Sequence, residues 1–286
     1  MRQLIVTGDD FGLSVAVNEA IVAAHQDGIL TTTSLMMSGE AAADAVARAQ
    51  RTPSLKVGLH VVLVCGQPLL SPKSVPNLVD QNGNFSDRLV RAGVNFFFRP
   101  SVRQQLEAEI RAQFEAFRNT GLALDHVNAH NHMHLHPTVF KLILKIGRDF
   151  GVRAVRLPYE PFSSAWRGSS KHNILPRLAM ALFLSPWLSV MRWRLRKAKL
   201  LCNDYIFGMS DTGQMTSTRV LEVLANLPQG VSEMYFHPGA DAGPDASAQA
   251  PRGQEFVALT SPAVLAALRQ SGIQEVTFSG LVARGH

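Results

Sequence analysis

The sequence predicts one α/β domain, a distorted (β/α) barrel of about seven parallel strands with an apolar and basic helical insert. Short β-prone runs alternate with helical patterns along the whole chain, which favours parallel strands joined by helices. Polar residues collect where several of these runs end, as they do at the site of an α/β barrel. The 286 residues, 46% of them hydrophobic, are enough for a single large core. We therefore expect one domain over residues 1–286, with an insert at residues 160–200.

Apolar and β-branched residues mark the expected strands, in chain order at residues 3–7, 31–37, 56–64, 126–136, 152–157, 232–236 and 275–278. Helical periodicity marks the expected helices, at residues 13–26, 41–50, 104–118, 138–150, 218–226 and 262–271. Gly28 and Gly151 follow two of these helices and are typical stop signals. Residues 69–86 and 240–253 are rich in Pro, Gly, Asn, Asp and Ser, which predicts loops.

The composition excludes several classes of protein. Cys65 and Cys202 belong to no Cys-x-x-Cys pair, so neither a zinc knuckle nor a disulfide scaffold is indicated. The net charge of +6 is concentrated in a basic cluster between Arg192 and Lys199. With few aromatic residues and no recognised module, that cluster does not predict nucleic-acid binding. The N-terminal residues MRQLIVTGDDFG meet two acids too early for a signal peptide, so we expect a cytoplasmic protein.

The densest chemical signal is the segment HVNAHNHMHLHP. It places a polar ring or amide at every even position, namely His126, Asn128, His130, His132, His134 and His136. An extended strand would send this row to one face and the apolar residues Val127, Ala129, Met133 and Leu135 to the other. Imidazoles at that density suit metal binding or proton transfer. The alternative is a surface tract or a set of core histidines.

Four further residues stand at expected strand ends. Asp9 and Asp10 follow the first strand, His60 lies in KVGLHVVL, and His237 lies in YFHPG. Each has an ordinary structural explanation, because Asp is a good helix N-cap and a lone His on an apolar strand is often structural. Their shared position at strand ends favours one common site.

The motifs TGDDFGLS, GLHVVL, HVNAHNHMHLHP, FHPG and EFVALTSP occur in that order between Asp9 and Pro262. Together they resemble the YdjC-like carbohydrate deacetylase family, which includes the chitooligosaccharide deacetylases. The stretch GVRAVRLPYEP and the insert after it are most similar to the hopanoid-biosynthesis-associated deacetylases within that family. The resemblance implies a distorted (β/α) barrel that holds one divalent metal ion.

The resemblance also implies roles for five residues: Asp10, His60 and His130 as metal ligands, Asp9 as general base and His237 as general acid. One carboxylate and two imidazoles leave open positions on a zinc-like ion, which would acidify a water and polarise an acetamide carbonyl. Zn²⁺ suits this donor set best, although the ligands alone do not exclude Ni²⁺, Co²⁺ or Mg²⁺.

Several neighbours are candidates for supporting these groups. Arg156 or Arg153 is the expected cation that keeps Asp9 ionised. His132 and His134 are candidate contacts for the metal ligands or the substrate, because they share the expected face of His130.

Asn128 is a candidate partner for the second nitrogen of a metal-bound histidine. Relatives often carry Asp at this position, which is the one departure from the family pattern. The sequence assigns no role to His126 or His136.

Residues Leu178–Met191 carry no charge, but 14 residues interrupted by Pro186 are too few to span a bilayer. With the basic cluster and Trp193, they suit a segment from Leu178 to Lys199 lying in a membrane interface. A buried helix with a basic end is the alternative.

The expected substrate is an N-acetylglucosamine moiety on a lipid, specifically an N-acetylglucosaminyl hopanoid, met at the inner face of the membrane. A deacetylase of soluble N-acetylglucosamine oligomers such as chitobiose is the first rival. A metal-binding barrel without turnover is the second. The sequence does not decide the oligomeric state, although barrels of this kind often form homodimers.

Overall fold

The computed structural model describes residues 1–161, 174–239 and 252–284, and only the backbone of residues 174–181. Within that part of the chain, seven strands form one parallel sheet in the order β4-β3-β2-β1-β6-β5, with β7 paired to β1. They are β1 (Arg2–Phe11), β2 (Thr32–Leu35), β3 (Lys56–Val61), β4 (Leu124–Ala129), β5 (Tyr205–Phe207), β6 (Gly230–Phe236) and β7 (Gln274–Glu275).

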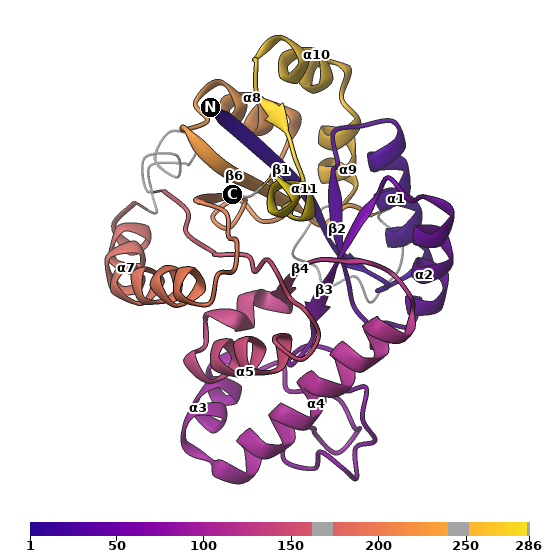
Figure 1. Cartoon of the computed structure of the whole chain (residues 1–286), viewed down its shortest axis with the longest axis vertical. Coiled ribbons are helices and arrows are strands. Elements are labelled where there is room, and N and C mark those ends of the chain that lie inside the picture. The colour runs from indigo at the N-terminus through magenta and orange to yellow at the C-terminus, as the bar shows by residue number, and fades with distance from the viewer. Residues whose placement is uncertain (162–173, 240–251, 285–286) are drawn as a thin grey trace.

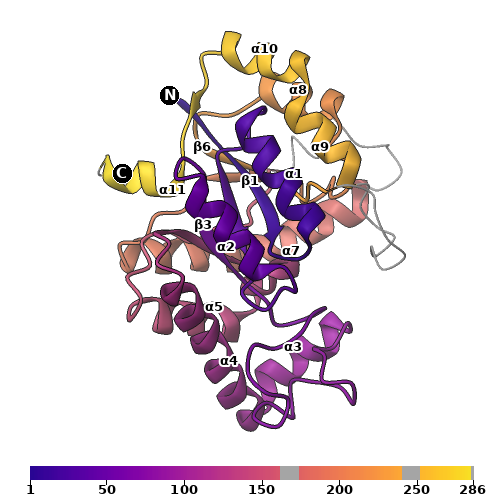
Figure 2. The same cartoon turned by 90° about the vertical axis from the view of Figure 1, so that its right-hand side faces the viewer.

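Helices surround this curled sheet (Figure 1), and the expected α/β barrel class is therefore confirmed. They are α1 (Val15–Gln26), α2 (Ala42–Arg51), α3 (Leu89–Phe98), α4 (Pro100–Asn119), the 3₁₀ turn η1 (His130–Leu135), α5 (Pro137–Gly147), α7 (Ile174–Lys197), α8 (Ser217–Ala225), α9 (Arg252–Thr260), α10 (Pro262–Gln270) and α11 (Phe278–Ala283). Figure 2 shows α1 and α2 against one side of the sheet and α3 with α4 at one end.

The segment 153–159 links the two ends of the sheet. On one side, the backbone N–H of Arg156 donates to the carbonyl of Val127 in β4 at 3.0 Å. On the other side, Ile206 in β5 donates to the carbonyl of Tyr159 at 2.9 Å. The sequence predicted a strand at residues 152–157, and the structure instead has isolated bridges there. This irregular connection closes the barrel and carries Arg156 into its buried interior.

The prediction of an extended histidine row over residues 126–136 is confirmed only for residues 126–129, which belong to β4, and is wrong from His130 onward. Pairing between β3 and β4 ends at Val61 and Ala129, so the chain beyond has no neighbouring strand to extend along. Asn131 and His132 then adopt left-handed backbone conformations, with φ of 51° and 52°. Left-handed φ is uncommon without glycine, and Asn and His tolerate it better than most residues. The chain therefore turns at the point where the first ligand candidate of the row stands.

Three helices were not predicted: α3, α9 and α11. In α3 only Ala92 and Phe96 are buried, so its apolar residues do not mark a single inner face. The predicted last strand at residues 275–278 is wrong beyond Glu275, because the Thr277 hydroxyl accepts from the Gly280 N–H and starts α11 at Phe278. Of the predicted loop 240–253, residues 240–251 lie outside the described residues.

Helix α7 holds the described part of the expected insert, while residues 162–173 of that insert lie outside the description. One side of α7 packs inward through Leu188, Met191 and Leu195. The indole N–H of Trp187 donates to the carbonyl of Leu135 at 2.7 Å, which ties α7 to the end of η1. Among the helices of the described residues, none combines the length and the hydropathy required to cross a membrane.

Candidate metal centre

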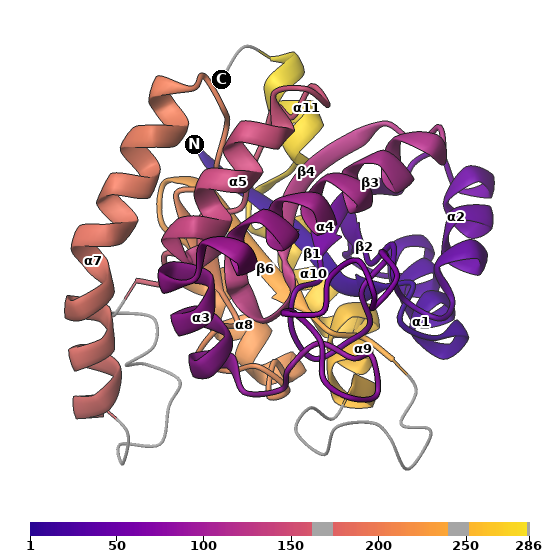
Figure 3. The same cartoon turned by 90° about the horizontal axis from the view of Figure 1, so that it is seen from below.

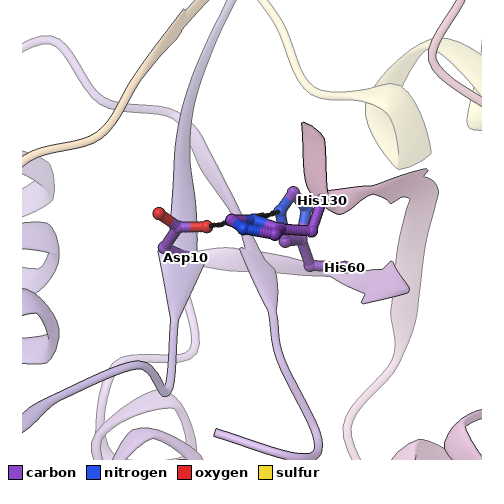
Figure 4. A group of neighbouring side chains, drawn as sticks. All are labelled: Asp10, His60 and His130. Atoms are coloured by element: carbon purple, nitrogen blue, oxygen red, sulfur yellow. Dashed lines mark hydrogen bonds and ion pairs between the residues drawn. The ribbon is translucent and has the colours of Figure 1, made fainter. Parts of the chain in front are cut away.

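Three side chains from different elements converge at the ends of β1, β3 and β4 (Figure 4). Oδ1 of Asp10 lies 3.1 Å from Nδ1 of His130 and 3.4 Å from Nε2 of His60, and those two nitrogens are 3.4 Å apart. Donors bound at about 2.1 Å to one tetrahedral ion are themselves about 3.4 Å apart. These three residues therefore fit one face of a tetrahedral metal site and leave a further position open. A donor set of two nitrogens and one oxygen favours a transition metal such as Zn²⁺.

The backbone at the end of β1 separates two adjacent acids. Asp10 has φ of 67°, a left-handed conformation, and Gly12 follows with φ of 96°. The buried Asn18 side chain accepts from the Gly12 N–H at 2.7 Å and holds this turn. A Cβ on Gly12 would lie 2.9 Å from the carbonyl oxygen of Met36, so glycine is required there. As a result Asp10 meets the two histidines, whereas Asp9 meets different partners.

Asn128 orients His60. Its amide nitrogen donates to Oδ1 of Asp9 at 3.0 Å, which turns its carbonyl oxygen toward His60. That oxygen lies 2.7 Å from Nδ1 of His60, so Nδ1 carries the proton and donates it. Nε2 of His60 is then the unprotonated nitrogen that a metal requires. The amide at position 128 thus serves both neighbours, and a carboxylate there could not donate to Asp9.

Asp9 lies against a buried cation. Arg156 donates from Nη1 to Oδ2 of Asp9 at 2.5 Å and from Nη2 to Oδ1 at 3.0 Å. Burial alone would raise the pKa of Asp9, but the Arg156 guanidinium outweighs it and holds that pKa far below its usual range. Of the two expected cations, Arg156 occupies the place beside Asp9, and Arg153 is exposed.

His237 stands at the end of β6, beside both acids. Its imidazole is near enough to lower the pKa of Asp9 and of Asp10. Its backbone N–H donates to Oε2 of Glu255 at 2.6 Å, and its ring stands edge-on to Tyr235 with centroids 5.5 Å apart. The structure therefore brings the five residues of the expected machinery into one cluster.

The remaining histidines of the row are dispersed. His132 stands edge-on to Tyr235 at 5.0 Å, and burial followed by the nearby Arg156 cation lowers its pKa to about 3. His134 is fully buried, and neither of its ring nitrogens has a hydrogen-bond partner among the described residues.

His126 and His136 have structural contacts. His126 lies 3.0 Å from Asp125 through Nδ1 and stacks on Phe278 with centroids 4.6 Å apart. His136 accepts from the Thr138 N–H at 3.2 Å and so caps α5.

Four neighbours of the site were missed in the sequence: Ser34, Glu233, Arg252 and Glu255. Ser34 donates to Oδ1 of Asp9 at 2.7 Å, and Glu233 accepts from Arg156 at 2.7 Å and 3.0 Å. Glu233 gave one usable signal, since it is an acid in the apolar strand run VSEMYF. A fully buried acid of this kind needs a cation, and Arg156 supplies it.

Comparison with known proteins identifies the family of this chain. A model of the family described as "YdjC-like protein" matches residues 3–270. A carbohydrate deacetylase of Geobacillus stearothermophilus is 31% identical over 284 residues, which cover 97% of this chain and 97% of that protein. The chain belongs to the YdjC-like family.

Two further comparisons bear on length and fold. A carbohydrate deacetylase of Brevibacillus brevis is 39% identical over 160 residues, which is 55% of this chain and about 60% of that relative. The crystal structure of a proposed cellobiose-phosphate cleavage protein from Enterococcus faecalis superposes with a TM-score of 0.74 over 98% of both chains. At 23% identity that likeness establishes the fold alone.

Proposed function

We propose that this protein is a metal-dependent N-deacetylase that removes the acetyl group from an N-acetylglucosamine moiety. The observation that carries the proposal is the convergence of Asp10, His60 and His130, with Asp9 and His237 directly after the paired residues Gly8 and Phe236 of the adjacent strands β1 and β6. Both matched relatives are named carbohydrate deacetylase, which supports the same reaction.

A bound Zn²⁺ would polarise the amide carbonyl and lower the pKa of an attacking water. Asp9 takes the proton of that water through Oδ2, which accepts from Arg156 alone, whereas Oδ1 accepts from three donors in the described residues. His237 delivers a proton to the departing amine nitrogen, which is otherwise a very poor leaving group. Arg156 keeps Asp9 ionised and fixes its orientation.

The proposed substrate is lipid-linked, an N-acetylglucosaminyl hopanoid met at the inner face of the membrane. Helix α7 exposes large apolar side chains, among them Phe183 (79%) in its middle and Trp193 (59%) next to its basic end. Helix α3 adds Val90 (83%) and Phe98 (70%), and neither helix contains an acidic residue. Exposed apolar residues, Trp and basic side chains together suit the surface of an anionic bilayer.

Both helices lie beside the turn that carries His130. In α3, the rings of Phe96 and Phe97 stand edge-on to the ring of His136, with centroids 5.9 Å and 6.1 Å apart. In α7, the indole of Trp187 donates a hydrogen bond to the carbonyl of Leu135. Figure 3 shows α5 and α3 beside α7 on this side of the molecule. A membrane that met both helices would lie close to the catalytic turn.

A soluble N-acetylglucosamine oligomer is the second candidate substrate, and one cavity favours it. This cavity, of about 1080 Å³, lies between residues 65–88 and α3. Its wall adjoins the site, because the lining residues Leu63 and Cys65 directly follow β3, the strand that carries His60. The lining is mainly polar and includes Asn77, Asn95 and Arg91. Its volume exceeds what one sugar ring needs and suits additional sugar units.

The test is acetate release by the zinc-loaded protein from an N-acetylglucosaminyl hopanoid and from chitobiose, with Asp9→Asn in parallel. Turnover of the lipid alone supports the hopanoid substrate, and turnover of chitobiose alone establishes the soluble one. The variant should bind zinc but lose at least about a hundredfold in kcat. Release from neither substrate, with zinc bound, would favour the non-catalytic metal-binding barrel.

A further inference from the structure

Two side chains from the first turn of α9 contact residues of the site. Arg252 and Glu255 are three residues apart, a spacing that puts both side chains on the same face of a helix. That face contacts the ends of β1 and β6, where Asp10 and His237 stand. Both contacts connect residues far apart in the sequence, and α9 is one of the helices that the sequence patterns missed.

Arg252 holds the oxygen of Asp10 that does not face the histidines. Its Nη2 donates to Oδ2 of Asp10 at 2.8 Å, while Oδ1 points at His60 and His130. The two oxygens of Asp10 are thus divided between the metal position and one guanidinium. An outer partner of this kind fixes the direction of a metal-binding carboxylate.

Gly239 makes room for this arginine. A Cβ at position 239 would lie 3.0 Å and 3.2 Å from the Cδ and Cβ atoms of Arg252. The Gly239 N–H also points at the Arg252 carbonyl at 3.4 Å. The glycine of the HPG motif therefore lets Arg252 pass close to the backbone on its way to Asp10.

Glu255 holds the backbone of His237. It is 1% exposed, and its carboxylate accepts from two backbone N–H groups, that of His237 at 2.6 Å and that of Gly213 at 2.7 Å. The same oxygen that binds the His237 N–H lies 3.9 Å from its Nδ1. A buried carboxylate with two backbone donors is a rigid anchor, because losing either bond leaves a buried group unsatisfied.

We propose that Arg252 and Glu255 are positioning residues of this site: Arg252 directs the carboxylate of Asp10 toward the metal, and Glu255 fixes His237 for proton transfer. The role of Arg252 depends only on metal binding. The role of Glu255 rests on the proposed deacetylase function.

For Arg252, the experiment is calorimetric titration of the metal-free protein with Zn²⁺. Arg252→Met should weaken zinc binding by about 10-fold to 100-fold, and Arg252→Lys should recover part of it by supplying one donor. Arg48→Met is the matched control, since Arg48 pairs with Asp44 on the surface of α2 and should leave zinc affinity unchanged. The thermal midpoint of metal-free Arg252→Met should fall, because the buried carboxylate of Asp10 loses its cation, so zinc is titrated at a temperature at which the variant is folded. Wild-type zinc affinity in Arg252→Met would overturn the proposal.

For Glu255, the experiment is steady-state kinetics of Glu255→Gln on whichever substrate releases acetate. The amide keeps one acceptor oxygen but turns N–H groups toward the second backbone donor, so one bond is lost. The turnover number kcat should fall at least about tenfold, while KM and zinc affinity stay at wild-type values. Unchanged kcat, or a loss of zinc affinity equal to that of the Arg252 variant, would overturn this role.

A second measurement tests the role of Glu255 even if no substrate is turned over. In the amide NMR spectrum, the His237 N–H resonance should shift in Glu255→Gln, because its bond at 2.6 Å changes. If the wild type releases no acetate, the proposed function fails, but the zinc titrations still decide the role of Arg252. An unshifted His237 resonance would contradict the anchor.

Discussion

Arg156 and Asp9 form a two-pronged ion pair in the interior of the barrel, with Nη1 and Nη2 at 2.5 Å and 3.0 Å from the two carboxylate oxygens. Nε and Nη2 of the same guanidinium bond to Glu233 at 3.0 Å and 2.7 Å. One buried cation therefore serves two buried carboxylates. Removing it leaves two buried carboxylates without a cation, which costs far more than losing a surface ion pair.

Arg156→Met should destabilise the protein by about 3–5 kcal/mol at pH 7. The pKa of Asp9 lies below its ordinary value of 3.8, so the stabilisation is complete above that pH and is lost as the pH falls through the lower folded value. The difference in the free energy of unfolding between wild type and variant should therefore become smaller in acid. Urea unfolding at pH 7 and at successively lower pH measures it.

Arg111→Met is the control for that experiment, because Arg111 and Asp149 pair at 2.8 Å with both side chains well exposed. It should change stability by less than about 1 kcal/mol at either pH. Equal stability of Arg156→Met and the control at pH 7 would contradict a buried, uncompensated pair of acids.

Asn128 gives a prediction about the metal. Asn128→Leu removes the acceptor from Nδ1 of His60 and a donor from Asp9, so zinc affinity should fall by about 10-fold to 100-fold. Asn128→Asp keeps the acceptor and should retain zinc affinity, while its added charge beside Asp9 should lower kcat. Asn119→Ala at the exposed end of α4 is the control. Zinc titration that finds wild-type affinity in Asn128→Leu would refute this role.

Strand ends leave a local signature that marked four residues of the site, whereas the choice of His130 as the third metal ligand came from the family resemblance alone. An apolar run that stops at Asp9 and Asp10, and others that reach His60 and His237, mark positions that parallel strands bring to one edge. The turn at His130 left no such signature. The alternation of polar and apolar residues continues past Ala129 and does not show where the strand stops. The strand stops there because its pairing with β3 ends at Val61.

Long-range partners were out of reach for a different reason. Arg252 lies 242 positions from Asp10 in the sequence, and no local pattern reports a contact at that separation. Arg156 was reachable only as one of two arginines on the same run, because an extended segment shows which residues alternate but not which face is inside. Burial separates them, with Arg156 at 0% exposure.

His134 predicts a pH dependence of stability. Burial lowers its pKa well below the usual 6.5, so the folded state keeps it neutral while the unfolded chain protonates it. Its contribution to stability is present above pH 6.5 and is lost as the pH falls toward the lower folded pKa. Each such histidine costs at most about 1.4 kcal/mol per pH unit in that window.

His134→Leu removes this titration and should flatten the slope of unfolding free energy between pH 6.5 and pH 5. It should not destabilise the protein at pH 8, because both ring nitrogens lack a partner among the described residues. His25→Leu, at a partly buried position on α1, provides the comparison. If the slope of unfolding free energy against pH is unchanged in His134→Leu, other titrating groups cause the loss of stability below pH 6.5.

The outward faces of α7 and α3 predict binding to anionic vesicles. Phe183→Ser with Trp193→Ser removes two exposed apolar side chains, worth about 3 kcal/mol together if a bilayer buries them. The partition coefficient onto phosphatidylglycerol vesicles should then fall about a hundredfold. Phe98→Ser in α3 should lower it further, and added salt should weaken binding because the basic end of α7 meets anionic lipid.

Val257→Ser is the matched control, since Val257 is 60% exposed on α9 and outside both helices. It should leave vesicle binding unchanged. Co-sedimentation of the wild type with neutral phosphatidylcholine vesicles should be weak. If the wild type ignores both kinds of vesicle and sedimentation velocity shows a dimer that Trp193→Ser dissociates, a second copy of the chain covers this face, and the membrane assignment is wrong.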